Sequence, residues 1–460
     1  MPTPCGEIGG EILLVDSVSE TDCDVLIIGG GAAGLCAAIS AAESGARTIV
    51  LEKNRRPGVK ILISGGTRCN ITNARGLRSL RGVTGPIHPD YDSRQAQGAR
   101  SIQAAFGVGG KFLGPALRAF SVERTVDLFE SQGVATKIES NGKIFPASDR
   151  AKDVLDALIR RLERSGATLR CNSPVNSITP MEKGFCVGSP DGTLKASRVI
   201  LSVGGRSYPG CGTTGDGYAI SAQFGHSIID PRPALVPLRV KAQWVLDLKG
   251  LTLPDIVATI VSQSGEPLIE RREAMLFAHF GLTGPAILDV SRAVTRLNES
   301  MYPMLSIDLF PGIRFDELDR QIQETSRLGR KTVANLVPAV VPRRLADILV
   351  QEACIPEGRI SPDFSREERK QLVMRCKALR IALDGTLGFS KAEVTSGGVA
   401  IEEVEARTMQ SKSRPGLFFA GEVLDLDGLI GGYNFQAAWS TGWLAGLSAS
   451  SSLSSQGSGG

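Results

Sequence analysis

The sequence has little of the chemistry that metal centres and redox disulfides require. Its 460 residues include only three histidines, His88, His226 and His279, which lie far apart in the chain. The nine cysteines form no C-x-x-C or C-x4-C pair, although a dithiol reductase needs two thiols within reach of each other. These absences argue against a zinc site and a redox dithiol, and no metal is expected. The cysteines are scattered along the chain and their total is odd, which indicates free thiols in a reducing compartment.

Targeting signals and a strong net charge are also absent. No Lys or Arg precedes Arg47, whereas the first 22 residues contain five acidic side chains, the opposite of a signal or transit peptide. The 52 basic and 48 acidic residues leave a net charge of +4, so the overall charge requires neither a nucleic acid nor an anionic membrane as a partner. We therefore expect a cytoplasmic protein with a small-molecule substrate, no nucleic-acid partner and no membrane partner. A plastid or mitochondrial location is the alternative if a longer precursor was trimmed.

One uncharged apolar run, residues 25–42, approaches the length of a membrane span but is not expected to form one. The run has 18 residues, including four glycines, and a strand, a turn and a helix explain it better than a spanning helix. Residues 24–28 predict a buried strand, 32–44 a helix that ends at Gly45, and 47–52 a second buried strand. Together they predict a complete β–α–β unit.

A G-x-G-x-x-G motif, GGGAAG at 29–34, lies between the first strand and the helix. Gly29 lets the chain turn sharply, Gly31 lets a pyrophosphate approach the backbone, and Gly34 lets the helix pack closely on the strand. The helix N-terminus then offers N–H groups and a partial positive charge to the phosphates. Glu52, at the end of the second strand, can accept hydrogen bonds from an adenosine ribose and disfavours NADP at this site. The motif predicts dinucleotide binding but does not distinguish FAD from NAD.

Two further segments favour FAD. Residues 53–73 are basic and then rich in glycine and small polar groups, which suits a loop around a diphosphate and a ribityl chain, although a solvated surface loop is the alternative. Residues 416–438 contain a strand that ends at Gly421 and a Gly-Gly pair that opens a helix. The N-terminus of this helix can face the pyrimidine edge of a flavin and stabilise its reduced form. Asp425 is placed to bond the ribityl or pyrophosphate region.

The chain resembles the BaiN/RdsA-type, or YhiN-like, NAD(P)/FAD-dependent oxidoreductases from about residue 23 to 447. The resemblance depends on five motifs in order: GGGAAGL at 29–35, SGGTRCNITN at 64–73, LFAHFGLTGPAILDVS at 276–291, VTSGGVAIEEVEARTMQSK at 394–412 and GLFFAGEVLDLDGLIGGYNFQAAWSTG at 416–442. It implies an α/β fold with a discontinuous Rossmann-like FAD-binding domain of the two-dinucleotide-binding type, an inserted β-rich domain and a helical cap. The expected boundaries are 23–208 and 382–447 for the FAD domain, 209–314 for the insert and 315–381 for the cap. Composition predicts a flexible tail at 1–22 and a disordered one at 448–460.

The resemblance also implies a set of residues that bind FAD, including a backbone contact from Val175 to adenine. In the N-terminal half these are Gly29, Gly31, Ala33, Gly34, Glu52, Lys53, Lys60, Ser64, Gly65, Arg68, Cys69 and Asn70. In the rest of the chain they are Val175, Gly204, Gly421, Glu422, Asp425, Gly432, Asn434 and Phe435. Two positions depart from the family pattern: Thr67 replaces a usual Gly, and Phe435 a usual Leu.

The predicted reaction passes hydride from NAD(P)H to N5 of FAD and reduces an unidentified small organic substrate. The catalytic residue stays unassigned; His279 and Cys69 are weak candidates, and Tyr208, Arg206 and Arg271 weaker ones. A second G-x-G-x-x-G at 210–215 does not directly follow a strand, so we interpret it as a flavin-side or substrate-side loop, and NAD(P)H is expected to bind transiently over the flavin. The alternatives are a flavin-dependent oxidase or monooxygenase, and an FAD-binding redox sensor without turnover. A third is a nucleic-acid-modifying flavoprotein, against which the near-neutral net charge argues.

Overall fold

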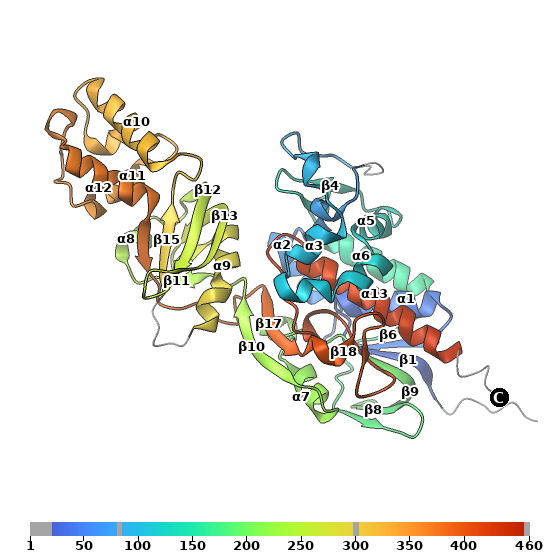
Figure 1. The fold of residues 1–460 in the computed structure, drawn as a ribbon. Helices are drawn as coiled ribbons and strands as arrows, with labels where there is room; N and C mark the ends of the chain where they lie inside the picture. Colours follow the sequence, from blue (N-terminus) through green and yellow to red (C-terminus); the bar gives the residue numbers. More distant parts are fainter. Residues whose placement is uncertain (1–20, 81–84, 298–302, 455–460) are drawn as a thin grey trace, which may run out of the picture.

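The computed structural model describes residues 21–80, 85–297 and 303–454. It shows two lobes joined by a ribbon of two strands (Figure 1). The larger lobe contains the N-terminal and C-terminal parts of the chain, and the smaller lobe is formed by the middle. Most of the predicted flexible tail at 1–22 lies outside the described residues, as do residues 455–460.

A nine-stranded sheet forms the centre of the larger lobe, in the order β18-β19-β20-β9-β1-β2-β6, with β7 paired to β8 and β8 to β9. The parallel strands are β1 (Cys23–Ile28), β2 (Thr48–Leu51), β6 (Thr168–Arg170), β9 (Gly192–Leu201) and β20 (Leu417–Phe419). The antiparallel strands are β7 (Ser177–Pro180), β8 (Phe185–Ser189), β18 (Val404–Glu405) and β19 (Gln410–Ser411). Val25, Leu26 and Ile27 of β1 are fully buried, because a central parallel strand is covered on both faces.

The apolar run at 25–42 is divided between β1 and helix α1 (Ala32–Glu43), as the sequence predicts. Among the helices in the described part of the chain, none is long and apolar enough to cross a membrane. Helix α1 packs against the C-terminal helix α13 (Tyr433–Ser454) through small residues. A Cβ on Gly442 would come within 2.2 Å of the Ala33 carbonyl oxygen, and one on Gly446 within 2.1 Å of that of Ala37. Only glycine permits so close a contact between the two helices.

Helix α13 also corrects the prediction for the C-terminus. It continues to Ser454, so the expected disorder from residue 448 is wrong for 448–454. Ala445 and Ala449, four residues apart on one face of the helix, are both fully buried. Ser450 Oγ donates a hydrogen bond to the Ser44 carbonyl at the end of α1. The Ser-rich composition of this segment gives no indication of these contacts.

The segment between β2 and β6 adds helices and a small antiparallel sheet of order β3-β5-β4. The strands are β3 (Thr72–Asn73), β4 (Thr136–Ile138) and β5 (Lys143–Pro146). The helices are α2 (Val59–Thr67), α3 (Ala99–Ala104), α4 (Gly114–Ala119), α5 (Val122–Glu130) and α6 (Ala151–Arg164), with 3-10 turns η1 (Ala74–Gly76), η2 (Ser93–Gln95) and η3 (Gly107–Lys111). In α6 the buried Val154, Leu158 and Leu162 recur at helical spacing.

The smaller lobe is a six-stranded antiparallel sheet with helices around it. In sheet order the strands are β11 (Leu238–Arg239), β14 (Gly281–Thr283), β13 (Pro267–Ala278), β12 (Thr252–Val261), β15 (Met304–Asp308) and β16 (Leu379–Ala382). The helical elements are α8 (Gln243–Asp247), α9 (Pro285–Arg296), α10 (Phe315–Arg327), α11 (Arg343–Glu352), α12 (Arg366–Lys377), η5 (Val333–Leu336) and η6 (Ser361–Asp363). Leu318, Leu349 and Leu372 of the cap helices share one buried cluster with Ile256 and Ile307 of the sheet. The predicted cap and insert therefore have a common core.

The two lobes are connected by β10 (Ile228–Ala234) and β17 (Val394–Val399), which pair antiparallel. Before the ribbon come η4 (Pro209–Cys211) and α7 (Asp216–Gln223), whose Tyr218 belongs to the core of the larger lobe. After the ribbon come η7 (Ile401–Glu403) and η8 (Gly421–Val423). The smaller lobe thus begins near residue 235 and ends near 393, whereas the insert predicted at 209–314 and the cap predicted at 315–381 together span 209–381. Strand pairing between segments far apart in sequence sets these boundaries.

Candidate cofactor cavity

A cavity of about 790 Å³ opens at the carboxyl ends of β1, β9 and β20. Its wall includes Gly29 after β1, Gly204 after β9 and Gly421 after β20, together with residues of α2 and the first residues of α13. In open α/β sheets this edge is where ligands bind. The volume lies within the range of roughly 300–1,000 Å³ that is usual for ligand sites.

The three glycines of the fingerprint have three separate roles. A Cβ on Gly29 would come within 2.7 Å of the Ser202 carbonyl oxygen, and one on Gly34 within 1.8 Å of the Gly29 carbonyl oxygen. A Cβ on Gly31 would meet nothing within 4 Å, so open space lies in front of this residue. Gly31 is also the N-cap of α1 and carries no side-chain capping bond. The first turn of α1 can therefore receive an anionic diphosphate.

Glu52 is held beside this loop by two backbone donors. Gly30 N donates to Oε2 at 2.7 Å, and Asn54 N donates to Oε1 at 2.8 Å. These bonds fix the carboxylate at the cavity wall, and its two oxygens keep lone pairs that can accept hydrogen bonds from ribose hydroxyls. Val175 lines the same end of the cavity, near Ser173, whose N donates to the Glu52 carbonyl at 2.9 Å.

The opposite end of the cavity is formed by a bend in α2. Gly65, Gly66 and Thr67 have φ values of 55°, 68° and 69°, so the chain leaves the helical conformation there. Ser64, Gly65 and Arg68 line the cavity, and Thr67 is exposed. Since a β-branched residue is strained at positive φ, Thr67 holds a conformation that glycine would adopt without cost.

Asn70 connects this bend to the start of α13. When the side-chain amide of Asn70 is oriented so that its oxygen and its nitrogen are both hydrogen-bonded, Oδ1 accepts from Gly432 N at 2.9 Å and Nδ2 donates to the Thr72 carbonyl at 2.9 Å. Gly432, Asn434 and Phe435 line the cavity next to it. The N-terminus of α13 therefore faces the cavity, where its dipole would stabilise negative charge on a flavin pyrimidine.

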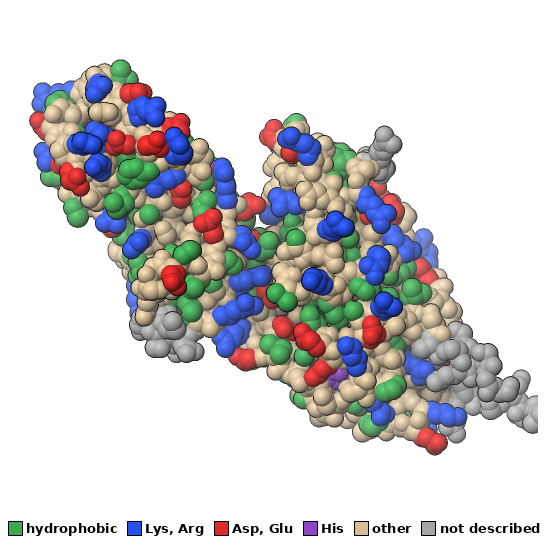
Figure 2. Space-filling model, in the orientation of Figure 1, with side chains coloured by type: hydrophobic (Ala, Val, Ile, Leu, Met, Phe, Trp, Pro, Cys, Tyr) green, Lys and Arg blue, Asp and Glu red, His purple; other side chains and the backbone are tan. Residues whose placement is uncertain are grey.

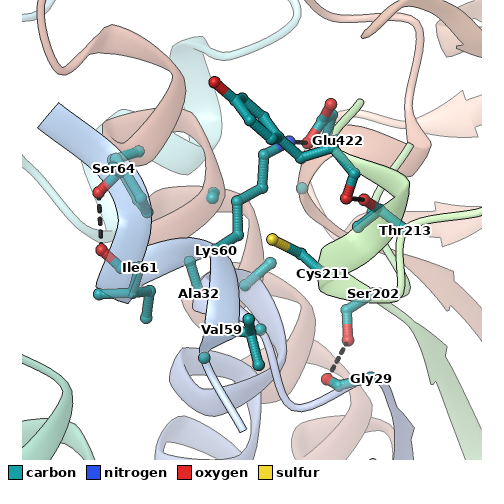
Figure 3. A pocket seen from close by; sticks show the side chains of 18 of the residues that line it. Gly29, Ala32, Val59, Lys60, Ile61, Ser64, Ser202, Cys211, Thr213 and Glu422 are labelled. Atoms are coloured by element: carbon teal, nitrogen blue, oxygen red, sulfur yellow. Dashed lines mark hydrogen bonds and ion pairs between the residues drawn. The ribbon is translucent and has the colours of Figure 1, made fainter. Parts of the chain in front are cut away.

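A polar network occupies the wall between the two ends (Figure 3). Lys60 Nζ lies 2.6 Å from Glu422 Oε2 and 2.5 Å from Ser207 Oγ. Glu422 Oε1 accepts from Ser207 Oγ at 2.7 Å and from Thr395 N at 2.8 Å. Figure 3 shows the Lys60 side chain reaching across the cavity to Glu422, with the Cys211 thiol turned toward its aliphatic part. Glu422 is thus a fully bonded carboxylate.

Seventeen of the twenty residues that the sequence analysis assigned to FAD line this one cavity, which brings together segments from three parts of the chain. These are Gly29, Gly31, Ala33, Glu52, Lys53, Lys60, Ser64, Gly65, Arg68, Asn70, Val175, Gly204, Gly421, Glu422, Gly432, Asn434 and Phe435. The open space at Gly31, the acid at Glu52 and the two helix N-termini fit an adenine dinucleotide with a flavin at its other end.

The other candidates lie elsewhere. Gly34 is packed against the strand, and Asp425 accepts a hydrogen bond from Gly397 N behind the wall. Cys69 is buried, and burial raises the pKa of its thiol to about 12, so it is not a redox-active thiolate. His279 lies in the exposed turn between β13 and β14, beside Phe280 and away from the cavity wall. Neither of the two weak catalytic candidates lines the cavity.

The cavity wall also contains residues outside the twenty that the sequence assigned to FAD. Cys211, Gly212 and Thr213 line it, which agrees with a flavin-side loop at 210–215, and Asn54 Nδ2 bonds the Cys211 carbonyl at 3.1 Å. Glu393 and Tyr208 also line the wall. Tyr208 was a weak candidate, and no sequence motif marks Glu393 as a cavity residue.

Comparisons with known proteins agree with this architecture. The chain matches the family described as the HI0933-like protein Rossmann domain over residues 23–83 and 95–448. It is 31% identical to the ribosomal RNA dihydrouridine synthase of Escherichia coli K12 over 91% of this chain and 96% of that protein. It is 30% identical to the 3-dehydro-bile acid delta(4,6)-reductase of Clostridium scindens over 92% of this chain and 98% of the relative.

The fold also matches a solved structure. The 3-ketosteroid-Δ4-(5α)-dehydrogenase of Rhodococcus jostii RHA1, in complex with 4-androstene-3,17-dione, superposes with a TM-score of 0.52 at 15% identity. The match covers 94% of this chain and 98% of the dehydrogenase. At this identity the likeness shows the fold alone.

Proposed function

This chain belongs to the HI0933-like family of FAD-dependent oxidoreductases, and from this premise we propose that it uses NAD(P)H to reduce a carbon–carbon double bond conjugated to a carbonyl group. The observation that carries the proposal is the single cavity, in which the phosphate end and the flavin end of an FAD site lie in one continuous wall. When bound, FAD supplies hydride transfer between the nicotinamide donor and the substrate.

The chain's own residues define how the cofactor would be held. The first turn of α1 at Gly31 would take the diphosphate, and Glu52 the adenosine ribose. Lys60 stays bonded to Glu422 and Ser207, so it positions the wall and adds no unpaired charge. The N-terminus of α13 at Gly432 would stabilise negative charge on the reduced ring.

Two relatives indicate the class of double bond. Dihydrouridine arises from uridine by reduction of a ring double bond conjugated to a carbonyl, and a delta(4,6)-reductase acting on a 3-dehydro compound reduces a bond conjugated to its ketone. The two reactions share this chemistry although their substrates differ greatly in size. Because both relatives cover more than nine-tenths of this chain, we assign the shared chemistry to it, with a small organic molecule as the first candidate substrate.

The position of the 210–215 loop supports a single site for both half-reactions. Cys211, Gly212 and Thr213 line the FAD cavity, which argues against a separate nicotinamide site at this second glycine motif. We therefore expect NAD(P)H to bind over the flavin, leave, and be replaced by the substrate. Such an order gives ping-pong kinetics.

An anaerobic titration of the purified holoprotein with NADH and with NADPH tests the proposal. Bleaching of the visible flavin absorbance by one nucleotide, followed by recovery on addition of an enone and not of air alone, is the expected result. Rapid recovery in air without an enone would favour the oxidase alternative. A flavin that neither nucleotide bleaches would refute the NAD(P)H-dependent reductase.

A second candidate substrate, a base within RNA, is favoured by the uneven distribution of charge. Residues 53–122 contain twelve Lys and Arg residues and two acidic ones, a net charge of +10 against +4 for the whole chain. The expectation of no nucleic-acid partner depended on the overall charge, which averages over this segment. A polyanion responds to the local charge.

The basic segment lies beside the cavity. Arg100 of α3, Lys111 of η3 and Arg118 of α4 are exposed and have no ion-pair partner within the described ranges. The segment that carries these three residues packs on the loop that forms the cavity wall. Leu429 N donates to the Ala105 carbonyl at 3.1 Å, and a Cβ on Gly109 would lie 3.0 Å from Leu426. Figure 2 shows Lys and Arg side chains on this lobe and where the lobes meet. Phosphates bound here would leave one base within reach of the cavity.

A further inference from the structure

We propose that Glu393 is the catalytic acid of this enzyme, which gives the proton that completes reduction of the double bond. The inference depends on the proposed reductase function and assigns a proton donor to it. Glu393 lies where the chain returns from the smaller lobe, one residue before β17, and its side chain lines the cavity. Its N donates to the Leu235 carbonyl at 3.1 Å, which ties it to the residue where the chain enters that lobe.

The carboxyl group of Glu393 is unusual because it is half-buried in the cavity wall and has no hydrogen-bond partner among the described residues. No hydrogen bond or ion pair reaches its side-chain oxygens from any described residue. Leu235 and Val394, on either side of it, are apolar residues of the same wall. A carboxyl group in such surroundings is more stable when it is neutral.

The neighbouring Glu422 shows the opposite environment. Glu422 is bonded to Lys60 Nζ, Ser207 Oγ and Thr395 N at 2.6–2.8 Å, so both of its carboxyl oxygens accept hydrogen bonds. Burial raises the pKa of Glu393, and the charge of Glu422 raises it further, while the Lys60 ammonium lowers it. Two nearby carboxyl groups in contrasting environments divide into an acid and a fixed anion, a pattern known from other enzymes.

Two other protonated groups line the same cavity, Tyr208 before η4 and Cys211 within it, but they are weaker acids. Burial raises the pKa of Tyr208 above its usual value near 10 and that of Cys211 above its usual value near 9. A general acid is most effective when its pKa lies near the working pH. Of the groups on the cavity wall, Glu393 meets this condition best, because its ordinary value lies below neutrality and the shift is upward.

The step balances with NAD(P)H as the two-electron reductant. A hydride equivalent adds to the carbon β to the carbonyl, and the π electrons move to the carbonyl oxygen as an enolate. The O–H bond of Glu393 breaks, its proton forms the new C–H bond at the α carbon, and the enolate returns to a ketone or amide carbonyl. The carboxylate is then reprotonated from water.

The experiment compares Glu393→Gln with a matched control, Glu182→Gln, whose exposed carboxyl group lies outside the cavity. Infrared spectra of the oxidised holoprotein, recorded without substrate over a series of pH values, report the protonation state of the carboxyl groups. A carbonyl band of a protonated carboxyl group that disappears only above the ordinary glutamate value of 4.5 should be present in wild type and in the control, and absent in Glu393→Gln. Equal bands in wild type and Glu393→Gln would overturn the proposal.

Stopped-flow kinetics then read the proton transfer with 4-androstene-3,17-dione or a uridine oligonucleotide as the probe. Bleaching by the nicotinamide donor should be unchanged in the control Glu182→Gln, and reoxidation by the probe should slow by roughly 10²- to 10⁴-fold in Glu393→Gln and not in the control. In wild type the reoxidation rate should fall as pH rises through the pKa of Glu393, and in the variant this fall should vanish. Reoxidation at the wild-type rate would refute the acid role, whereas no bleaching in wild type would refute the reductase itself.

Discussion

The two lobes use glycine and side chains in opposite ways. In the larger lobe the cavity depends on backbone geometry, with Gly29, Gly31 and Gly34 at the fingerprint and Gly442 at the contact between helices. In the smaller lobe a continuous cluster of Leu, Ile and Val side chains holds sheet and cap together. The backbone therefore forms the cofactor site, and the insert is an apolar body that reaches the cavity only near its two ends. Substitutions should reveal this difference.

The largest effect is expected at Gly34. A Cβ there would lie 1.8 Å from the Gly29 carbonyl oxygen, so Gly34→Ala should push α1 off β1 and abolish both folding and flavin retention. Gly31→Ala is the matched control, because its Cβ meets no protein atom within 4 Å. It should leave the thermal unfolding of the apoprotein unchanged and weaken FAD binding, measured by titration of the apoprotein. Normal FAD affinity in Gly31→Ala would contradict the assignment of the diphosphate to this position.

In the smaller lobe the sensitive positions are apolar side chains. Leu349 of α11 is fully buried in the common core, so Leu349→Ala should lower the free energy of unfolding by about 2–5 kcal/mol. Bound flavin should be retained, because none of the residues that line the cavity belongs to α11. Val340→Ala, at a residue that is 60% exposed, should change stability by less than about 0.5 kcal/mol. Urea unfolding and flavin absorbance measure both effects, and loss of flavin from Leu349→Ala would show that the lobes are not independent.

The contrast also explains which features the sequence could predict. The fingerprint and the Gly431-Gly432 turn are local patterns, and their spacing alone predicts a cofactor site. Glu393 has no such pattern, because its burial arises when β10 and β17, about 160 residues apart, come together. Cys69 lies within a cofactor motif, yet its side chain points into the core. The fold class and the glycine-rich turns of the cavity wall were therefore predictable, whereas the rest of the wall, the side-chain environments and the lobe boundaries required the tertiary structure.

Where the lobes meet, Asp289 of α9 makes stability depend on pH. Its Oδ1 accepts a hydrogen bond from Ile430 N of the larger lobe at 2.8 Å, and burial raises its pKa to about 6. The protonated carboxyl group of Asp289 therefore stabilises the fold. Because its pKa in the folded protein exceeds the ordinary value of 3.8, this contribution is full below pH 3.8 and is lost as pH rises through about 6. Asp289→Asn keeps the acceptor without the charge, so its melting temperature should exceed that of wild type at pH 8 and match it at pH 4. Parallel pH curves for the two proteins would show that Asp289 does not titrate in this range.

The smallest effect is expected from a triple substitution that tests which lobe would bind a polyanionic substrate. We expect Arg100→Gln/Lys111→Gln/Arg118→Gln to weaken binding of a labelled uridine-rich single-stranded RNA roughly 10- to 100-fold at about 0.1 M salt. The slope of log affinity against log salt should fall by about 2, because single strands lose about 0.7 per phosphate contact. The matched control, Arg320→Gln/Arg330→Gln/Lys370→Gln, removes the same charge from exposed cap positions and should leave binding unchanged.

Fluorescence anisotropy measures RNA binding by all three proteins, and reduction of the flavin by NAD(P)H tests that both variants are intact. Equal losses in the two triple variants would mean that RNA responds only to net charge, which would leave the small organic molecule as the substrate. A loss confined to the first variant would mean that the backbone-built lobe holds both the cofactor and the chain that carries the reduced base.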